Sequence, residues 1–259
     1  MKLPVALTIA GSDSGGGAGI QADLKTFAAL GVHGTSAITA ITAQNTLTVT
    51  AIQELPPSMI RAQIDAVFED LHPVAAKTGM LSSAEIIECV ASYRLRNLVV
   101  DPVMVAKGGA RLLKEDAVTA LRELLVPQAA VITPNLPEAE VLLGRSIPDL
   151  AARRQAAFDL KALGPTAVVL KGGHAGDAID LFYDGERLVE LPGEQVETDN
   201  THGSGCVFSA AIAAGIARDM QLLEAVREAK AFIQRAIERS LDVGKGHGPV
   251  NPMWEREIP

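Results

Sequence analysis

The sequence is short of cysteine and of basic charge, and each shortage excludes a class of protein. Two cysteines, Cys89 and Cys206, are too few for a disulfide framework in a chain of 259 residues. We therefore expect reduced thiols and a cytoplasmic location. The chain holds 23 Lys and Arg against 31 Asp and Glu. This balance argues against nucleic acid or an anionic membrane as a partner, because no basic patch is available to neutralise many phosphates at once.

Long apolar runs and linkers are also missing. The first apolar run ends at Gly11. This run is too short for a secretion signal or a membrane span. Apolar residues make up 48% of the chain and charged residues 21%, values typical of a globular protein. Without a Pro/Ser-rich linker, a repeat or a low-complexity segment, we expect a single domain over residues 1–259.

Short apolar runs alternate with longer helical patterns along the chain. The predicted strands are Leu3 to Ala10, Ser36 to Thr42, Val74 to Lys77, Leu98 to Val100, Ala129 to Thr133, Ala167 to Leu170, Ile179 to Tyr183 and Arg187 to Leu191. The predicted helices are Gly19 to Leu30, Ser58 to Asp70, Ser82 to Leu95, Glu115 to Leu125, Asp149 to Leu163, Gly205 to Arg218 and Leu222 to Leu241. Ser82 with Glu85 three residues later predicts a capping box for the third of these helices.

This alternation predicts a mostly parallel sheet with helices on both faces, a three-layer α/β/α architecture. Asp184-Gly185 lies between the last two predicted strands and indicates a hairpin, hence an antiparallel addition at one edge. A (β/α)₈ barrel is the rival fold. The hairpin and the two successive helices at the end of the chain fit it poorly.

Polar residues and glycines follow the predicted strands where each strand ends. Ligands of open α/β sheets bind beyond these carboxyl ends. Turn residues are expected at any strand end, which accounts for the glycines. The need for turn residues accounts less well for Gln44, Asp101 and Lys171, which lie close to the ends of predicted strands.

The first glycine cluster, residues 11–19, fits neither the dinucleotide fingerprint nor the P-loop, because no G-x-G-x-x-G or G-x-x-x-x-G-K-[ST] can be placed on it. We expect a loop that approaches a ligand. Asp23, one turn into the following helix, is a candidate for the same pocket, although such a residue is more often solvated.

The second cluster, Asn200 to Cys206, feeds an apolar helix. A glycine-rich turn at a helix N-terminus points backbone N–H groups at one spot and adds the positive end of the helix dipole, so it predicts an anion hole. Cys206 falls in the first turn, where we expect a lowered thiol pKa and a functional role. For Cys89 we expect a small buried side chain.

Zinc motifs are missing, since the chain has no HExxH, no CxxC and no clustered His. Asp101 and Glu138 at strand ends suit Mg²⁺, which is usually held by one or two carboxylates together with phosphate and water. Lys171 suits a phosphate counter-charge. These residues predict phosphate chemistry in spite of the acidic net charge.

With these residues in view, the chain resembles the hydroxymethylpyrimidine/phosphomethylpyrimidine kinases of thiamine biosynthesis, in the ribokinase-like superfamily. The resemblance runs almost end to end. Its most specific segments are Thr8 to Thr26, Ala43 to Thr46, Asp101 to Met104, Thr133 to Glu140, Lys171 to His174, Asn200 to Cys206 and Gly244 to Gly246.

The resemblance implies an ATP- and Mg²⁺-dependent kinase, homodimeric, that phosphorylates 4-amino-5-hydroxymethyl-2-methylpyrimidine and then its monophosphate. It implies that Gln44 hydrogen-bonds the aminopyrimidine and that Gly11, Asp23, Met80 and Val103 line that pocket. The residues it places near Mg²⁺ are Asp101, Asn135 and Glu138. Those it places at ATP and the transferred phosphate are Lys171, Thr201, Gly203, Ser204, Gly205, Cys206 and Lys245.

Cys206 stands where sugar kinases and most pyridoxal kinases of the superfamily carry an Asp base, and the pyrimidine kinases share this Cys. Some relatives with Cys also accept pyridoxal or pyridoxine, so vitamin B6 kinase activity is the alternative. Ala106 to Gly109 is a candidate flap over the site. The chain has only six Phe, two Tyr and one Trp, none in the matched pocket motifs, so we expect a hydrogen-bonding residue such as Gln44 to carry much of the ring recognition.

Overall fold

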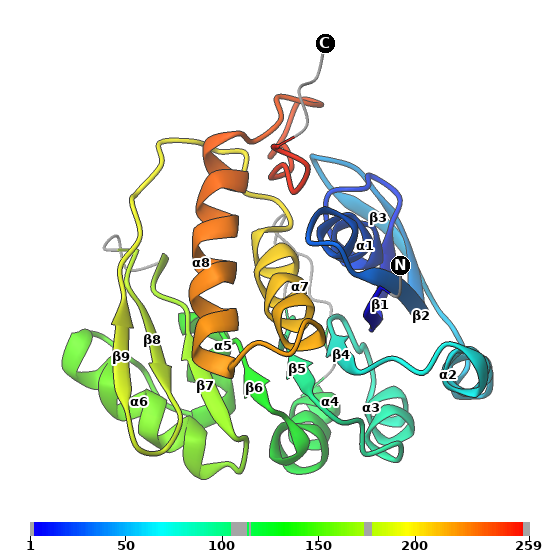
Figure 1. Ribbon diagram of the computed structural model, residues 1–259, viewed down its shortest axis with the longest axis horizontal. Helices are drawn as coiled ribbons and strands as arrows, with labels where there is room; N and C mark the ends of the chain where they lie inside the picture. The colour runs from blue at the N-terminus through cyan, green and yellow to red at the C-terminus, as the bar shows by residue number, and fades with distance from the viewer. Residues whose placement is uncertain (1–2, 105–112, 114, 174–177, 256–259) are drawn as a thin grey trace.

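One open nine-stranded sheet organises the computed structural model, which describes residues 3–104, 113, 115–173 and 178–255. The strand order is β3-β2-β1-β4-β5-β6-β7-β8-β9 (Figure 1). The strands are β1 (Val5–Asp13), β2 (His33–Gln44), β3 (Val49–Glu54), β4 (Ala75–Thr78), β5 (Leu98–Val100), β6 (Val131–Ile132), β7 (Ala167–Leu170), β8 (Asp180–Tyr183) and β9 (Leu188–Leu191).

Helices cover both faces of the sheet, so the predicted three-layer α/β/α class is confirmed and the rival barrel is excluded (Figure 1). The helices are α1 (Gly19–Ala29), α2 (Pro57–Asp70), α3 (Ala84–Ala91), α4 (Glu115–Ala120), α5 (Leu136–Leu143), α6 (Leu150–Ala162), α7 (Ser204–Ala217) and α8 (Leu222–Glu238). After α4 the chain continues as a π-helical turn, η1 (Leu121–Leu125), and a 3₁₀ turn, η2 (Val126–Gln128).

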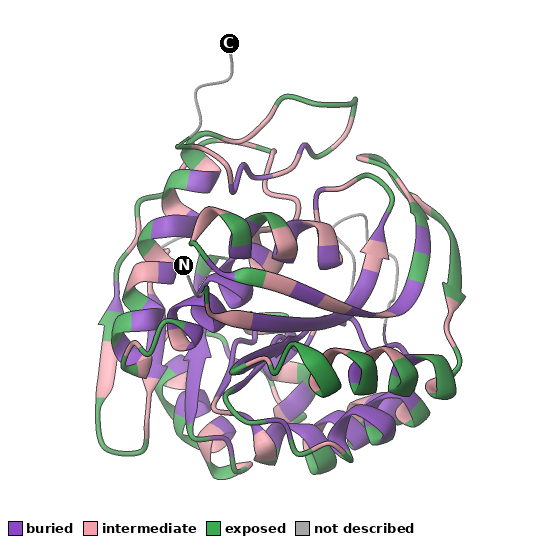
Figure 2. Ribbon diagram, turned by 45° about the vertical axis from the view of Figure 1, so that its right-hand side comes forward, coloured by how far each residue is buried: buried purple, intermediate pink, exposed green. Residues whose placement is uncertain are grey.

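Each face of the sheet packs against its own apolar core. One core joins the sheet to α2, α3, α4, α5 and α6, and the other joins it to α1, α7 and α8. Because the central strands are covered on both sides, they are buried along nearly their whole length (Figure 2). α7 is apolar around its circumference and is almost entirely buried, which fixes the place of its first turn.

Both edges of the sheet are antiparallel. The β8–β9 hairpin was predicted, whereas the pairing of β2 with β3 at the other edge was not. Most side chains of β3 are exposed, so this strand lacks the apolar alternation on which strand prediction depends.

The start of α3 differs from the prediction. Ser83, not Ser82, is its N-cap and accepts a hydrogen bond from the Ile86 N–H at 3.4 Å. The predicted capping box of Ser82 with Glu85 is therefore wrong. Ser82 is buried instead, and its hydroxyl has no hydrogen-bond partner among the described residues.

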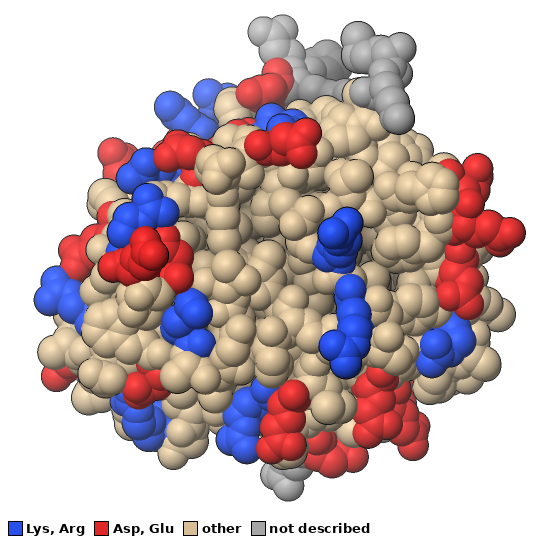
Figure 3. Space-filling model, turned by 60° about the horizontal axis from the view of Figure 1, so that its bottom comes forward, with Lys and Arg blue, Asp and Glu red and all other residues tan. Residues whose placement is uncertain are grey.

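Basic and acidic side chains are interspersed on the face of the molecule shown in Figure 3, without a continuous basic patch there. In the part of the chain that the structure describes, no helix is both long enough and apolar enough to cross a bilayer.

Candidate active site

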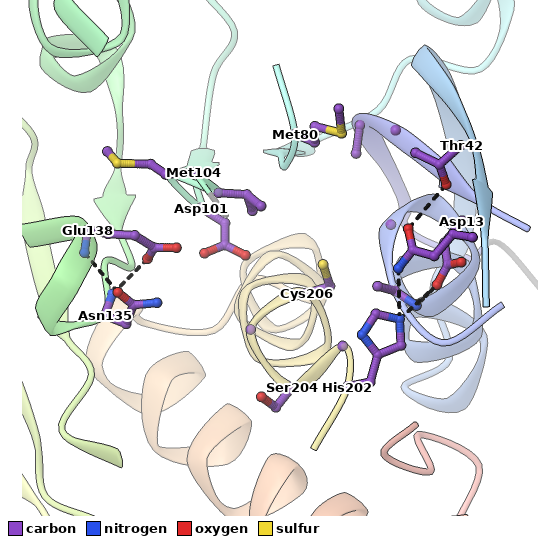
Figure 4. A pocket seen from close by; sticks show the side chains of 18 of the residues that line it. Asp13, Thr42, Met80, Asp101, Met104, Asn135, Glu138, His202, Ser204 and Cys206 are labelled. Carbon is purple, nitrogen blue, oxygen red and sulfur yellow. Dashed lines mark hydrogen bonds and ion pairs between the residues drawn. The ribbon is translucent and has the colours of Figure 1, made fainter. Parts of the chain in front are cut away.

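A cavity of about 550 Å³ lies at the carboxyl ends of the parallel strands, where open α/β sheets bind their ligands. The carboxyl ends of β1 and β2 and the start of α1 line one side of it. The segment after β5 and the start of α5 line the other, and the first turn of α7 lies between them (Figure 4). The predicted site residues that line the cavity are Gly11, Gln44, Met80, Asp101, Val103, Asn135, Glu138, Lys171, Thr201, Gly203, Ser204, Gly205 and Cys206.

Asp23 is not among the cavity-lining residues, contrary to the sequence expectation. Its carboxylate is fully buried, and both of its oxygens lie 2.9 Å from Nζ of Lys77. The hydroxyl of Thr8 donates a further hydrogen bond to it at 2.6 Å. Because all its neighbours are interior groups, Asp23 acts as one half of a buried ion pair rather than as a ligand contact.

Lys245 also lies outside the cavity lining. It is exposed in the segment after α8, so the structure does not bring it together with the other predicted ATP contacts. The candidate flap Ala106 to Gly109 falls outside the described residues.

The first glycine cluster is held in shape by a residue that the sequence analysis did not single out. The Asp13 carboxylate accepts hydrogen bonds from the backbone N–H groups of Gly15, Gly17 and Ala18, at 2.8 to 3.1 Å. Burial acts to raise the pKa of Asp13, but hydrogen bonds from His202, Gly15 and Ala18 outweigh it and leave this pKa below its usual value. Asp13 is therefore a carboxylate at neutral pH, and it shapes one wall of the cavity.

The second glycine cluster forms the predicted turn at the start of α7. Gly203 has a φ of +79°, which favours glycine. A Cβ atom there would lie only 1.8 Å from the carbonyl oxygen of Gly17. The two glycine clusters are thus in direct contact, and no side chain of the described residues caps the N-terminus of α7. The Ser204 N–H donates to the Thr201 carbonyl oxygen at 3.2 Å, which leaves the N–H groups of Gly205 and Cys206 available to an anion.

Lys171 lies between two acidic side chains at the same edge. Its Nζ is 3.2 Å from Oδ1 of Asp101 and 4.0 Å from Oε2 of Glu138. Burial acts to lower the pKa of Lys171, but these carboxylates outweigh it and raise the pKa above its usual value. A Cβ at Gly205 would lie 3.4 Å from Nζ of Lys171, so the lysine reaches the anion hole.

Asn135 and Glu138 form a reciprocal cap at the start of α5. The Asn135 side chain accepts the Glu138 N–H at 2.9 Å, and the Glu138 carboxylate accepts the Asn135 N–H at 2.8 Å. This capping box holds Glu138 at the cavity wall. Burial and the neighbouring Asp101 raise the pKa of Glu138 to about 7, against the opposing effect of Lys171.

The acidic residues suit a cation that arrives with phosphate. Among the described residues no cluster of three or more His, Cys, Asp or Glu side chains could hold a metal ion. Asp101 and Glu138 nevertheless offer hard carboxylate oxygens to the cavity, and Mg²⁺ needs only one or two of these when phosphate and water complete its shell. The donor set therefore fits Mg²⁺.

Cys206 points into the cavity between Asp101 and Met80 (Figure 4). The predicted lowering of its pKa is wrong. The residue as a whole is only partly buried, but burial of the thiol raises the pKa of Cys206 to about 11. The Lys77 ammonium and a hydrogen bond from the Gly19 N–H act to lower this pKa, but burial has the larger effect. At neutral pH the residue is a thiol.

Two further residues were missed in the sequence although each left a signal. Lys77 is a charged residue inside an otherwise apolar run that forms β4, which indicates a buried partner. His202 stands inside the second glycine cluster, and its Nε2 lies 2.9 Å from Oδ2 of Asp13. Both pairings join segments far apart in the sequence, so spacing alone could not reveal them.

Comparisons with known proteins agree with this geometry. A family model described as phosphomethylpyrimidine kinase matches residues 13–251. Hydroxymethylpyrimidine/phosphomethylpyrimidine kinases are similar over nearly the whole chain: that of Rhizobium meliloti is 53% identical, covering 95% of this chain and 96% of its own length, and that of Bacillus subtilis is 49% identical, covering 97% and 95%. The structure is also similar to an ADP complex of Bacillus subtilis pyridoxal kinase, with a TM-score of 0.90 and 42% identity, covering 96% of this chain and 97% of that one.

Proposed function

Because the chain belongs to the phosphomethylpyrimidine kinase family, we propose that it phosphorylates 4-amino-5-hydroxymethyl-2-methylpyrimidine with ATP and then phosphorylates the resulting monophosphate. Both steps belong to thiamine biosynthesis. One observation carries the proposal: a single cavity is lined by Gln44, the residue proposed to recognise the ring, and by Lys171 and residues 203–206 of the proposed anion hole. A small alcohol and a nucleotide phosphate can meet there.

The phosphate side of the cavity supplies positive potential without a basic surface. In this proposal the free N–H groups at the start of α7 receive the transferred phosphoryl group, and Lys171, held 3.2 Å from Asp101, neutralises charge on the β- and γ-phosphates. Phosphoryl transfer requires mainly such positioning and charge stabilisation. Asp101 keeps Lys171 charged and in place, while hydroxyls of Thr133 and Ser209 donate to Asp101 at 3.3 and 3.2 Å.

Asp101 and Glu138 are the residues that would hold Mg²⁺, with Asn135 fixing Glu138 through the capping box. When bound, Mg²⁺ neutralises phosphate charge and orients the triphosphate. Glu138 must lose its proton to bind a cation, so its raised pKa links cation binding to pH.

The ring side of the cavity depends on hydrogen bonds. No Phe, Tyr or Trp is among the described residues that line it, so the substrate ring has none of these three side chains to stack on there. The amide of Gln44 provides a donor and an acceptor on one group, which matches a ring nitrogen beside an amino group.

Cys206 is proposed to accept the proton of the substrate hydroxyl in the first step, through the small fraction of the residue that is thiolate. The second step starts from an ionised phosphate and needs no base. We therefore expect Cys206→Ala to slow the first step about 100-fold and the second step much less. Because the pKa of Cys206 is about 11, the first-step rate of the unaltered protein should keep rising at pH values well above 7, where Glu138 is already ionised, and that of the variant should level off there.

Both rates can be measured separately by starting from the alcohol or from the monophosphate. Cys89→Ala is the matched control, since Cys89 is a free thiol on α3 that does not line the cavity. Equal losses in both steps would make Cys206 a residue that shapes the anion hole rather than a base.

Vitamin B6 kinase activity is the second candidate, because the fold superposes closely on a pyridoxal kinase. A competition assay that offers the hydroxymethylpyrimidine, its monophosphate and pyridoxal with ATP and Mg²⁺ separates the two. We expect both pyrimidines to have the higher kcat/KM. A preference for pyridoxal would replace the proposed function by the alternative.

Two more parts of the proposal are a homodimeric assembly, which the family resemblance implies, and a cytoplasmic location, which the low cysteine content of the sequence favours.

A further inference from the structure

The side-chain amide of Gln44 lies between two fixed polar groups. One end of the amide is 3.3 Å from Nε2 of His202, and the other end is 3.2 Å from Oγ1 of Thr42. The nitrogen faces His202 and the oxygen faces Thr42. A half-turn about the last side-chain bond exchanges these two atoms and moves nothing else, so the hydrogen-bonding capacity of the neighbours decides between the two orientations.

His202 favours the exchanged orientation. Its Nε2 lies 2.9 Å from Oδ2 of Asp13, and Asp13, an ionised carboxylate, can only accept hydrogen bonds. Nε2 must therefore carry a hydrogen. An Nε2–H group repels the NH₂ end of the Gln44 amide and attracts its oxygen.

Thr42 favours the same orientation independently. Its hydroxyl lies 2.9 Å from the carbonyl oxygen of Ser12 and 3.2 Å from the Gln44 amide. With the Gln44 oxygen beside it, the single hydroxyl hydrogen would have two acceptors to serve. With the Gln44 nitrogen there, Thr42 donates to Ser12 and accepts from Gln44, while the Nε2 hydrogen of His202 is shared between Asp13 and the Gln44 oxygen, so no two donors face each other.

We infer that Asp13, His202 and Thr42 are positioning residues that lock the Gln44 amide with its oxygen toward His202, and that this lock selects the substrate ring by its order of donor and acceptor. The inference rests on the proposed function. His202 and Thr42 each engage one side of the amide, so one acceptor position of the oxygen and one N–H remain for the cavity, which Gln44 lines. These match the amino group and the neighbouring ring nitrogen of a 4-aminopyrimidine.

A 4-oxopyrimidine presents the opposite order, with a carbonyl oxygen beside a ring N–H. It would need the amide exchanged. The ring cannot turn over to compensate, because its hydroxymethyl group has to reach the anion hole at the start of α7. The lock should therefore reject the oxo analogue although it has nearly the same shape as the amino substrate.

The protonation of His202 tests the lock without any substrate. Long-range ¹H–¹⁵N correlation spectra of the five imidazoles, with His202 assigned from the spectrum of His202→Phe, should show a hydrogen on Nε2 of His202 at neutral pH. A neutral ring with its hydrogen on Nδ1 would overturn the inference.

The selectivity between the amino substrate and its 4-oxo analogue tests the consequence of this lock. We expect the ratio of kcat/KM for the amino substrate to that for its 4-oxo analogue to fall about tenfold in His202→Phe, through the KM values, because one hydrogen bond no longer fixes the amide. His247→Phe is the matched control, since the His247 ring lies outside the cavity lining and bonds the Asp199 carbonyl. An unchanged ratio in His202→Phe would overturn the lock alone. A wild-type protein that phosphorylates neither pyrimidine would overturn the proposed function instead.

Discussion

Lys171→Ala is expected to slow both phosphorylation steps by roughly 10²–10³-fold, the usual effect of removing one preorganised group that stabilises transition-state charge. Affinity for the pyrimidine should change little, because Gln44 and not Lys171 is placed to bind the ring. Removing the lysine also leaves Asp101 and Glu138 without their shared counter-charge. The two carboxylates then repel the phosphates that they previously helped to position.

The measurement pairs turnover in each step with calorimetric titration of the pyrimidine. Lys161→Ala on α6 is the control for loss of a lysine away from the cavity. Intact turnover with lost pyrimidine affinity would contradict the role given to Lys171.

Lys77→Met is expected to lower the free energy of unfolding by about 3–5 kcal/mol, since it leaves the Asp23 carboxylate buried without its partner. The side chains of both residues are 0% exposed, so water cannot replace the lost ammonium. Urea denaturation followed by circular dichroism would give the loss as a shift of the midpoint.

The double variant Lys77→Met with Asp23→Leu should recover much of that stability, because the buried charge is then gone from both sides. Glu224→Ala is the comparison, as it breaks an exposed pair with Arg227 and should cost less than about 1 kcal/mol. A double variant as unstable as the sum of the two single variants would show that Lys77 and Asp23 stabilise the fold independently.

The order and type of most elements could be predicted because the central strands are continuously apolar and the helices follow them with regular spacing. β3 could not, since its side chains are mostly exposed. α5 was overlooked although its signal was present: the N-x-x-E spacing of Asn135 and Glu138 is itself a capping box.

The site itself was predictable where it depends on strand ends. Gln44, Asp101 and Lys171 all reach one cavity because parallel strands end at a common edge. Asp23 and Cys206 show where local reasoning fails. The environment of each side chain depends on its burial and on Lys77, which comes from a distant strand. The position of a residue in its helix does not predict either of these.

The contact between the two glycine clusters decides how alanine scanning of the α7 turn should be interpreted. A methyl group at Gly203 collides with the backbone of Gly17, whereas one at Gly205 meets only Nζ of Lys171 and a carboxylate oxygen of Asp101 at ordinary contact distances. Failure at position 203 therefore reports a backbone collision and carries no information about chemistry. Failure at position 205 reports the space that the phosphate needs. Gly203 and Gly205 are separated by one residue and look alike in the sequence, but their substitutions test different properties of the turn.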